Sequence, residues 1–234
     1  MRETYQLVRV QDGKHDQEEI LGILRDIKSG KLKNDLKLLN YYHEVPVSYP
    51  VKIDTVEADS IEVSTNQAQA VVLSLQKQTL LTSAAFPQDL GVHGMVEYIN
   101  VKNCFAVLGR FAYASIRATR RGAVRVSVAE YIRSRFQADQ KSFDGEVIDV
   151  SISGIAIKVI GAMPVGIAES GSIQLDFQSS SAVIPAKIIK IAEIDGNHIC
   201  KCSIEPDAKA DKLLSQYIFS RQVDIIRNLK ELSQ

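Results

Sequence analysis

Two short polar patterns in the second half of the chain carry residue types that suit an anionic, planar ligand. A guanidinium group donates parallel hydrogen bonds to phosphate oxygens or to the O6 and N7 edge of guanine. A carboxylate accepts hydrogen bonds from the amide-like and amino donors on the Watson–Crick edge of guanine. The sequence holds both groups at short spacing, as RRGAVR over residues 120–125 and DVSISG over residues 149–154.

The individual positions divide these tasks in a way that favours a guanine nucleotide. Arg121 and Arg125 suit phosphate and the acceptor edge of guanine, while Asp149 suits its donor edge. Ser151 can donate to a phosphate, and Gly154 lets the backbone turn or lets a ligand approach closely. The sequence contains no GxxxxGK[ST] pattern and no acidic pair beside these residues that would hold Mg²⁺, which argues against an NTPase.

The elements around the two patterns are predicted to bring them together. Residues 123–136 alternate apolar and polar side chains with one irregularity, and residues 145–151 follow after a turn, so we predict two strands. Antiparallel pairing would return the end of the second strand to the start of the first. The arginines and the Asp-Ser-Gly turn would then line one rim. We assign Arg133 and Arg135 to the solvated outer face of the first strand.

The remaining periodicity predicts a mainly β chain with a helix near each end. Helical spacing predicts a short helix over residues 15–29 and a C-terminal helix over residues 207–232, capped by Asp207. Short β-rich runs between turn signals favour β-barrels or sandwiches. These runs lie at 45–53, 60–65, 70–75, 94–101, 104–111, 123–136, 145–151, 154–160, 172–177, 182–194 and 198–204.

Composition excludes several classes of function. The 28 basic and 28 acidic residues give a net charge of zero, which argues against a general nucleic-acid binder. Three cysteines without framework spacing argue against a secreted disulfide scaffold, and residues 1–19 are too charged for a signal peptide. No segment reaches the roughly 20 apolar residues of a spanning helix. We therefore expect a cytoplasmic protein without a membrane span.

The cysteines and histidines favour core packing over a metal site or a catalytic set. His198, Cys200 and Cys202 share one face of a predicted strand, but the outer two lie about 13 Å apart along the backbone. Tetrahedral zinc would need a sharp bend and a fourth ligand. We predict that Cys200, Cys202 and Cys104 lie in the core, with no metal bound. The histidines are scattered with no nucleophile motif near them, so we predict no enzymatic activity.

The two patterns together resemble the signature of the PilZ domain, a family that binds the bacterial second messenger cyclic di-GMP. That signature is Arg-x-x-x-Arg followed some 20–30 residues later by [Asp/Asn]-x-Ser-x-x-Gly. Here 23 residues separate Arg125 from Asp149, and every fixed position is matched. The β-rich stretch to residue 203 and the terminal helix are similar to the six-stranded barrel and C-terminal helix of the flagellar-brake (YcgR-like) class.

The resemblance implies a domain organisation and a fold class. Residues 41–115 are similar in layout to the N-terminal, split-barrel-like domain of that class, and residues 116–234 are similar to its PilZ domain with C-terminal helix. Residues 1–40 match no named domain and are expected to form a helical extension. The expected fold is mainly β, with two small antiparallel barrels, a C-terminal helix and a short N-terminal helix.

The resemblance also implies a ligand and the residues that hold it. Carried over by position, Arg121 and Arg125 would hold phosphate and guanine edges of cyclic di-GMP. Asp149, Ser151 and Gly154 would form the turn that grips a guanine. No cofactor or metal is implied.

Three neighbouring positions are further candidates for ligand binding, with less support from the motif. Arg120 precedes the motif, and in similar proteins an arginine there goes with an intercalated pair of ligand molecules. Arg117 and Ser153 are secondary candidates for the same site.

The arginine motif lies at the junction between the two β-rich halves, which suggests a receptor mechanism. Closure of the linker around the ligand would change the angle between the domains, and we predict that residues 119–123 are mobile and become ordered on binding. The implied partner is a protein such as a flagellar motor component, with recruitment to the flagellar basal body. A partner in secretion, polysaccharide synthesis or transcription fits the sequence equally well. The C-terminal helix also leaves a homodimer open.

Two other classes of function were kept as alternatives. One is a PilZ-like adaptor that uses its barrels only for protein contacts, as family members without the arginines do. The other is an enzyme or nucleic-acid binder that uses the arginine patch, which the missing acid–base set and zero net charge argue against.

Overall fold

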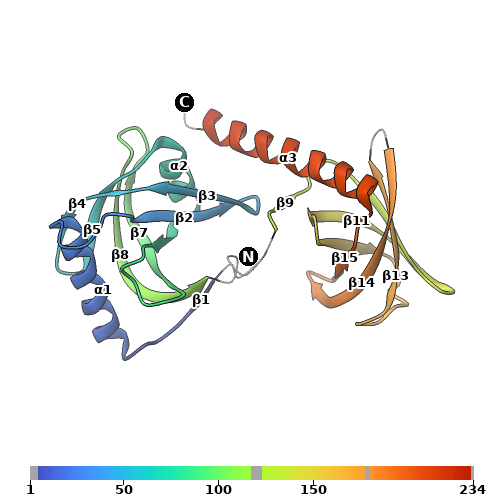
Figure 1. Ribbon diagram of the computed structural model, residues 1–234, viewed down its shortest axis with the longest axis horizontal. Helices are drawn as coiled ribbons and strands as arrows, with labels where there is room; N and C mark the ends of the chain where they lie inside the picture. Colours follow the sequence, from blue (N-terminus) through green and yellow to red (C-terminus); the bar gives the residue numbers. More distant parts are fainter. Residues whose placement is uncertain (1–4, 117–122, 178–179, 233–234) are drawn as a thin grey trace. The chain divides into compact units, whose positions relative to one another are not determined.

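The chain forms two β-rich units, each described here by itself (Figure 1). The computed structural model describes residues 5–116, 123–177 and 180–232. Contacts place the predicted N-terminal extension in the first unit and divide the C-terminal helix between the two units. The first unit comprises Met1–Tyr42, Pro46–Gly122 and Ile225–Gln234, and the second comprises His43–Val45 and Ala123–Asp224.

The first unit is built on one antiparallel sheet that curves into a half-barrel. Its strands follow the order β3-β2-β6-β7-β8-β5-β4, and β1 pairs with the end of β8, with Tyr5 opposite Ile116. Within the described residues no ladder joins the outer strands β3 and β4. The strands are β1 (Tyr5–Leu7), β2 (Lys37–Tyr42), β3 (Val45–Pro50), β4 (Lys52–Val56), β5 (Ser60–Ser64), β6 (Gln78–Thr82), β7 (Leu90–Asn100) and β8 (Phe105–Ile116).

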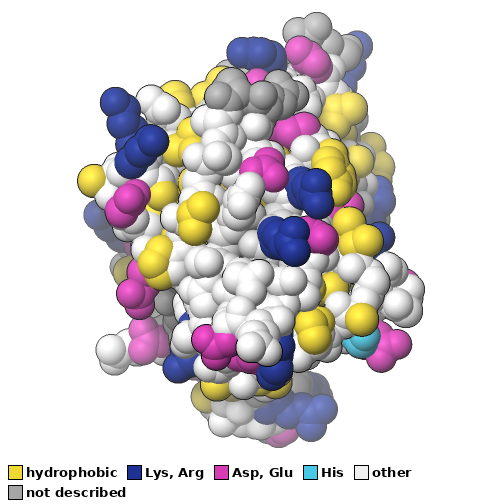
Figure 2. Space-filling view, turned by 90° about the vertical axis from the view of Figure 1, so that its right-hand side faces the viewer, with side chains coloured by type: hydrophobic (Ala, Val, Ile, Leu, Met, Phe, Trp, Pro, Cys, Tyr) yellow, Lys and Arg dark blue, Asp and Glu magenta, His cyan; other side chains and the backbone are white. Residues whose placement is uncertain are grey.

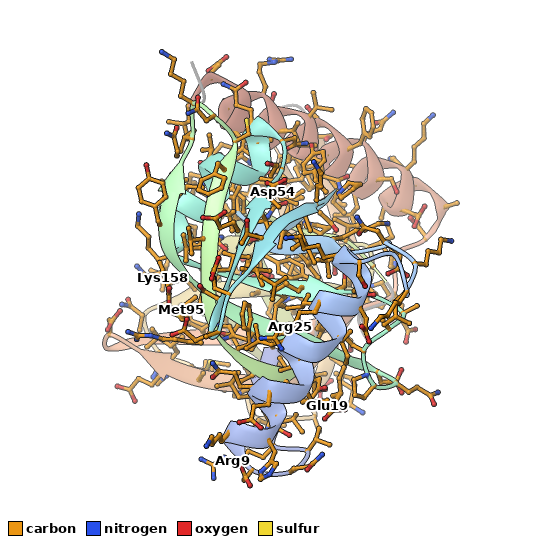
Figure 3. The ribbon with its side chains drawn as sticks, turned by 90° about the vertical axis from the view of Figure 1, so that its left-hand side faces the viewer. Arg9, Glu19, Arg25, Asp54, Met95 and Lys158 are labelled. Atoms are coloured by element: carbon orange, nitrogen blue, oxygen red, sulfur yellow. The ribbon has the colours of Figure 1, made fainter. Side chains whose placement is uncertain are left out.

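Helix α1 (Gly13–Lys28) supplies much of the core of this unit. It begins where the Asp12 side chain accepts hydrogen bonds from two backbone amides, and it stops before Gly30, whose φ is +79°. Its buried face, with Ile20 and Leu24, packs on β4 and β8. Figure 3 looks onto this helix and labels Glu19 and Arg25, and the Arg25 guanidinium donates to the Glu57 carbonyl at 3.2 Å. The predicted helix at 15–29 is confirmed.

The predicted strand at residues 70–75 is wrong, because this segment lies in helix α2 (Gln67–Gln76). Asn66 caps the helix by accepting a hydrogen bond from the Gln69 amide at 2.9 Å, and Lys77 ends it in the left-handed conformation. The Gln69 side chain donates to buried Asn40 at 2.7 Å. A short apolar run alone does not distinguish a buried strand from a buried helix turn, and the capping asparagine decides here.

The second unit is a closed six-stranded antiparallel barrel. The order β10-β13-β14-β15-β12-β11 closes through a ladder between β10 and β11, and β9 adds to β11 as an extra strand. Core-facing side chains such as Phe136 and Phe143 stack with ring centroids 5.3 Å apart. The strands are β9 (Arg125–Ser127), β10 (Arg133–Ala138), β11 (Lys141–Ser151), β12 (Gly154–Ile160), β13 (Ser170–Phe177), β14 (Ser180–Ile194) and β15 (Asn197–Ile204).

The single strand predicted at 123–136 is two strands separated by an outward excursion. Both strands pair with β11, β10 with its beginning and β9 with its end. The Val128 amide donates to the Ile148 carbonyl, and the Val147 amide donates to the Ile132 carbonyl. Because Val147 and Ile148 are consecutive, residues 129–131 have no opposite residue in β11 and form a bulge. Tyr131 on this excursion is 60% exposed. The irregularity in the apolar alternation marks this break.

The C-terminal helix α3 (Ala208–Glu231) carries one buried stripe along its length. Its first turn is capped by Asp207, whose side chain accepts from the Ala210 amide at 2.8 Å, as predicted. Ala210, Leu214 and Ile218 are buried in the second unit, while Leu229 clusters with valines of the first unit.

The predicted fold class is therefore confirmed: a mainly β chain with a half-barrel, a closed six-stranded barrel and a C-terminal helix. Among the described residues, no helix has the length and apolar character needed to cross a membrane.

Candidate functional site

Strands β9, β11 and β12 bring four of the predicted site residues together. In the β9–β11 ladder Arg125 lies opposite Ser151, and Asp149 lies opposite Ser127. Side chains alternate across a strand, so Arg125 and Asp149 become diagonal neighbours on one face, while Val126 and Val150 turn to the other side. Both valines are buried in the barrel core. The predicted return of the second strand to the start of the first is thus the arrangement that the structure has.

Arg125 and Asp149 form a desolvated ion pair. Arg125 Nη1 donates to Asp149 Oδ1 at 3.0 Å, and the two side chains are 20% and 2% exposed. A buried carboxylate without a partner costs several kcal/mol, and the Arg125 guanidinium provides a charged partner at this depth. The pair therefore couples the two motifs directly, with one group from each.

The serine and glycine of the second motif form a two-residue hairpin. Ser151 lies opposite Gly154 in the β11–β12 ladder, and its buried hydroxyl donates to the Gly154 carbonyl at 3.1 Å. A Cβ atom on Gly154 would lie 3.3 Å from the Cys202 carbonyl oxygen and 3.4 Å from Arg125 Nη2. Glycine suits this position because other protein groups approach closely, whereas the sequence was consistent with either a turn or an approaching ligand.

The remaining predicted positions separate into two groups. Ser153 is exposed at the hairpin, and its carbonyl accepts from the Ile204 amide at 3.2 Å. Arg117, Arg120 and Arg121 lie outside the described residues, as does most of the predicted 119–123 segment. A role of all these residues in ligand binding stays a prediction.

Arg133 and Arg135 are exposed and Cys200 and Cys202 are buried, as predicted, whereas Cys104 differs from its prediction. Arg133 pairs with Asp144 at 3.5 Å on the exposed side of the barrel. Cys200 and Cys202 are buried with their sulfur atoms 3.7 Å apart, and the described residues contain no cluster that could hold a metal ion. Cys104 was predicted to lie in the core, but it is half-buried in a turn with a φ of +52°.

Sequence reasoning missed one residue that contacts this site from α3. Arg221 Nε donates to the Ser127 carbonyl at 3.1 Å, and Ser127 lies opposite Asp149. The available signal was an arginine three residues after Ile218, on the buried stripe of the terminal helix.

The surface of the second unit does not gather basic charge on the side that Figure 2 shows. Basic, acidic and hydrophobic side chains are mixed over that face. Phosphate recognition by a broad positive surface would require segregated basic residues. The Arg125–Asp149 pair instead offers a compact set of directional donors and acceptors.

Comparisons with solved structures found similar two-unit proteins at low identity. YcgR from Escherichia coli in complex with c-di-GMP is 15% identical, with 91% of this chain and 93% of that chain covered and a TM-score of 0.44. The K. pneumonia MrkH–c-di-GMP complex is 11% identical, with 91% and 96% covered and a TM-score of 0.45. The Bacillus subtilis inhibitor of motility (MotI/DgrA) is 14% identical, with 82% and 97% covered and a TM-score of 0.41.

Comparisons at the level of sequence gave one family match. The curated proteins contain no match to this chain. The family model of the PilZ domain matches residues 117–220, which include both motifs and all strands of the closed barrel. The match identifies residues 117–220 of this chain as a PilZ domain.

Proposed function

We propose that this chain is a receptor for cyclic di-GMP and that it has no enzymatic activity. The observation that carries the proposal is the Arg125–Asp149 pair, which joins the two halves of the family signature across adjacent strands of a PilZ domain. The guanidinium supplies donors for phosphate and for guanine O6 and N7, and the carboxylate accepts from the other guanine edge. Cyclic di-GMP, the family's known ligand, carries both phosphates and guanines.

The ligand must compete with an existing contact. Asp149 already accepts from Arg125, so a guanine that takes hydrogen bonds from this carboxylate must share or replace the ion pair. Arg121 from the preceding segment then adds a second guanidinium, and Arg120 favours an intercalated pair of ligand molecules. Ser151 and Gly154 belong to the same proposed site, where the bond from the Ser151 hydroxyl to the Gly154 carbonyl holds the hairpin.

We further propose that ligand binding is the input of a conformational signal. Arg117, Arg120 and Arg121 lie in the segment between β8 and β9, so a ligand that holds them against Asp149 would restrain the connection between the two units. The output would reach a protein partner in motility or biofilm control, in the cytoplasm or at the flagellar basal body. The ligand shifts this equilibrium only as far as it binds one arrangement more tightly than the other.

Calorimetric titration of cyclic di-GMP into the purified protein tests the receptor proposal. We expect binding at micromolar or lower Kd, with loss of measurable binding in Arg121→Ala and Asp149→Ala. A ligand-to-protein ratio near two would support the role of Arg120. Circular dichroism of each variant separates loss of binding from loss of folding. If the folded native protein gives no binding by heat or by equilibrium dialysis, the adaptor alternative is favoured and the receptor proposal is wrong.

Salt dependence separates a nucleotide receptor from a nucleic-acid binder. Six phosphate contacts to a duplex would reduce affinity roughly 10³-fold or more between 50 and 200 mM salt. A ligand with two phosphates, held in part through its bases, should lose far less. Titrations at both salt concentrations, with cyclic di-GMP and with a DNA duplex, therefore distinguish the two classes.

A further inference from the structure

The first half of helix α3 packs on the second unit, which also contains the strand that carries Arg125. Ala210, Leu214 and Ile218 are buried at spacings of four residues, which fixes the face that α3 turns to the second unit. The next position on that face is Arg221, which is half-buried. An arginine that continues an apolar stripe needs a polar partner, because a desolvated guanidinium without hydrogen bonds is costly.

The partner of Arg221 is a backbone group of β9. Arg221 Nε donates to the Ser127 carbonyl at 3.1 Å, a contact between residues 94 positions apart. Ser127 lies two residues after Arg125 and directly opposite Asp149 in the β9–β11 ladder. Arg221 therefore holds a residue that shares a strand with Arg125 and lies opposite Asp149.

A second contact of α3 lies one turn earlier, at the end of β13. The Tyr217 ring packs against Phe177 with centroids 5.5 Å apart. Burial raises the pKa of Tyr217, and the Glu130 carboxylate raises it further by a smaller amount. The helix thus contacts the second unit at β9 and at the end of β13.

Strand β9 needs such support because it is short and peripheral. It has three residues and stands at the end of the strand order of its sheet, with β11 as its partner. Short edge strands open locally at low cost, since few ladder hydrogen bonds must break. An opening of β9 would carry Arg125 away from Asp149.

We propose that Arg221 is a positioning residue of the ligand site: by holding the Ser127 carbonyl it keeps Arg125 in register with Asp149. The consequence for ligand affinity rests on the proposed function, whereas the consequence for β9 does not. Because coupling of two equilibria is reciprocal, ligand binding should also strengthen the docking of α3 on β9.

Hydrogen exchange of the ligand-free protein tests the structural half of this proposal. In Arg221→Ala, peptides that cover residues 124–131 should exchange at least about ten-fold faster than in the native protein, as expected when a hydrogen bond from a charged donor is lost. Lys212→Ala is the matched control, because it removes the same charge from an exposed position on the same helix. Arg221→Lys, which keeps the charge, gives a second variant if the alanine form does not fold.

Titration of cyclic di-GMP tests the functional half. We expect Arg221→Ala to weaken binding about ten-fold and Lys212→Ala to leave it unchanged. In a cycle with Arg125→Lys, the two losses should be less than additive, because a residue that acts through Arg125 has less to position once that side chain is replaced. A general loss of stability would instead give additive effects.

The outcomes separate the two proposals. Unchanged exchange at 124–131 in Arg221→Ala overturns the positioning role, and so does equal weakening in Lys212→Ala, which would indicate a charge effect only. If the native protein does not bind cyclic di-GMP, the proposed function is wrong, and the exchange measurement still decides whether Arg221 holds β9.

Discussion

Strand β11 pairs with an arginine-bearing strand at each of its ends, and the two Arg–Asp pairs differ in environment. In the first pair, Arg125 Nη1 lies 3.0 Å from Asp149 Oδ1, and the two side chains are 20% and 2% exposed. In the second pair, Arg133 Nη2 lies 3.5 Å from Asp144 Oδ1, and the two side chains are 57% and 40% exposed. Solvent screens the second pair, so it contributes about 0–1 kcal/mol to stability. The first pair is largely buried, and a buried charge without a partner is strongly destabilising. Burial, more than residue type, distinguishes the candidate site from the charged surface.

The difference arises from what covers each pair. At the Asp144 end, β10 alternates exposed arginines with core residues such as Phe136, so the charged side chains face solvent. At the Asp149 end, the side chains of Asp149 and Ser151 are buried, so little of the pair reaches solvent. The close approach of Gly154 to Cys202 and Arg125 completes this packing.

The largest expected effect is that of Asp149→Ala on stability. The substitution leaves the Arg125 guanidinium without its carboxylate partner, so we expect the free energy of unfolding to fall by about 3 kcal/mol. Urea denaturation followed by circular dichroism measures this change. A loss below 1 kcal/mol would mean that the pair is no more important than an exposed one.

A smaller effect is expected for Gly154→Ala. The added Cβ would press on the Cys202 carbonyl and the Arg125 guanidinium, and overpacking of this kind costs about 1–2 kcal/mol. The same displacement of Arg125 should weaken cyclic di-GMP several-fold. Denaturation and titration of one preparation check both numbers. Native affinity in this variant would show that the hairpin does not set the position of Arg125.

The smallest effect is expected for Arg133→Ala. Both members of its pair are solvent-exposed, so we expect a change in unfolding free energy below about 0.5 kcal/mol. Ligand affinity should be unchanged. A clear loss of affinity would extend the binding surface to β10 and remove the contrast between the two ends of β11.

Much of the site could be predicted from the sequence because local patterns encode it. Alternation predicted strands on both sides of a turn, and antiparallel pairing then implied that Arg125 and Asp149 meet. The turn expected at 143–145 was misplaced, because these residues pair with β10 within β11 and the chain turns at 139–140. The cap of α3 at Asp207 was equally local. These features depend on neighbours in sequence or on one strand ladder.

The missed features depend on contacts between distant segments. Helix α2 has an apolar run that suits a strand, and its buried bond from Gln69 to Asn40 is not visible in the sequence. The pairing of β1 with the end of β8 joins residues more than one hundred positions apart. The bond from Arg221 to Ser127 likewise requires knowledge of how α3 packs.

The most direct test of the central claim compares the two ends of β11 in one experiment. Cyclic di-GMP is titrated by calorimetry into the native protein, Arg125→Ala and Arg133→Ala at the same salt concentration. We predict micromolar or tighter binding by the native protein and Arg133→Ala, and a loss of at least about ten-fold in Arg125→Ala. Equal affinities in the two variants, or no binding by the folded native protein, would contradict the assignment of the site to the buried pair.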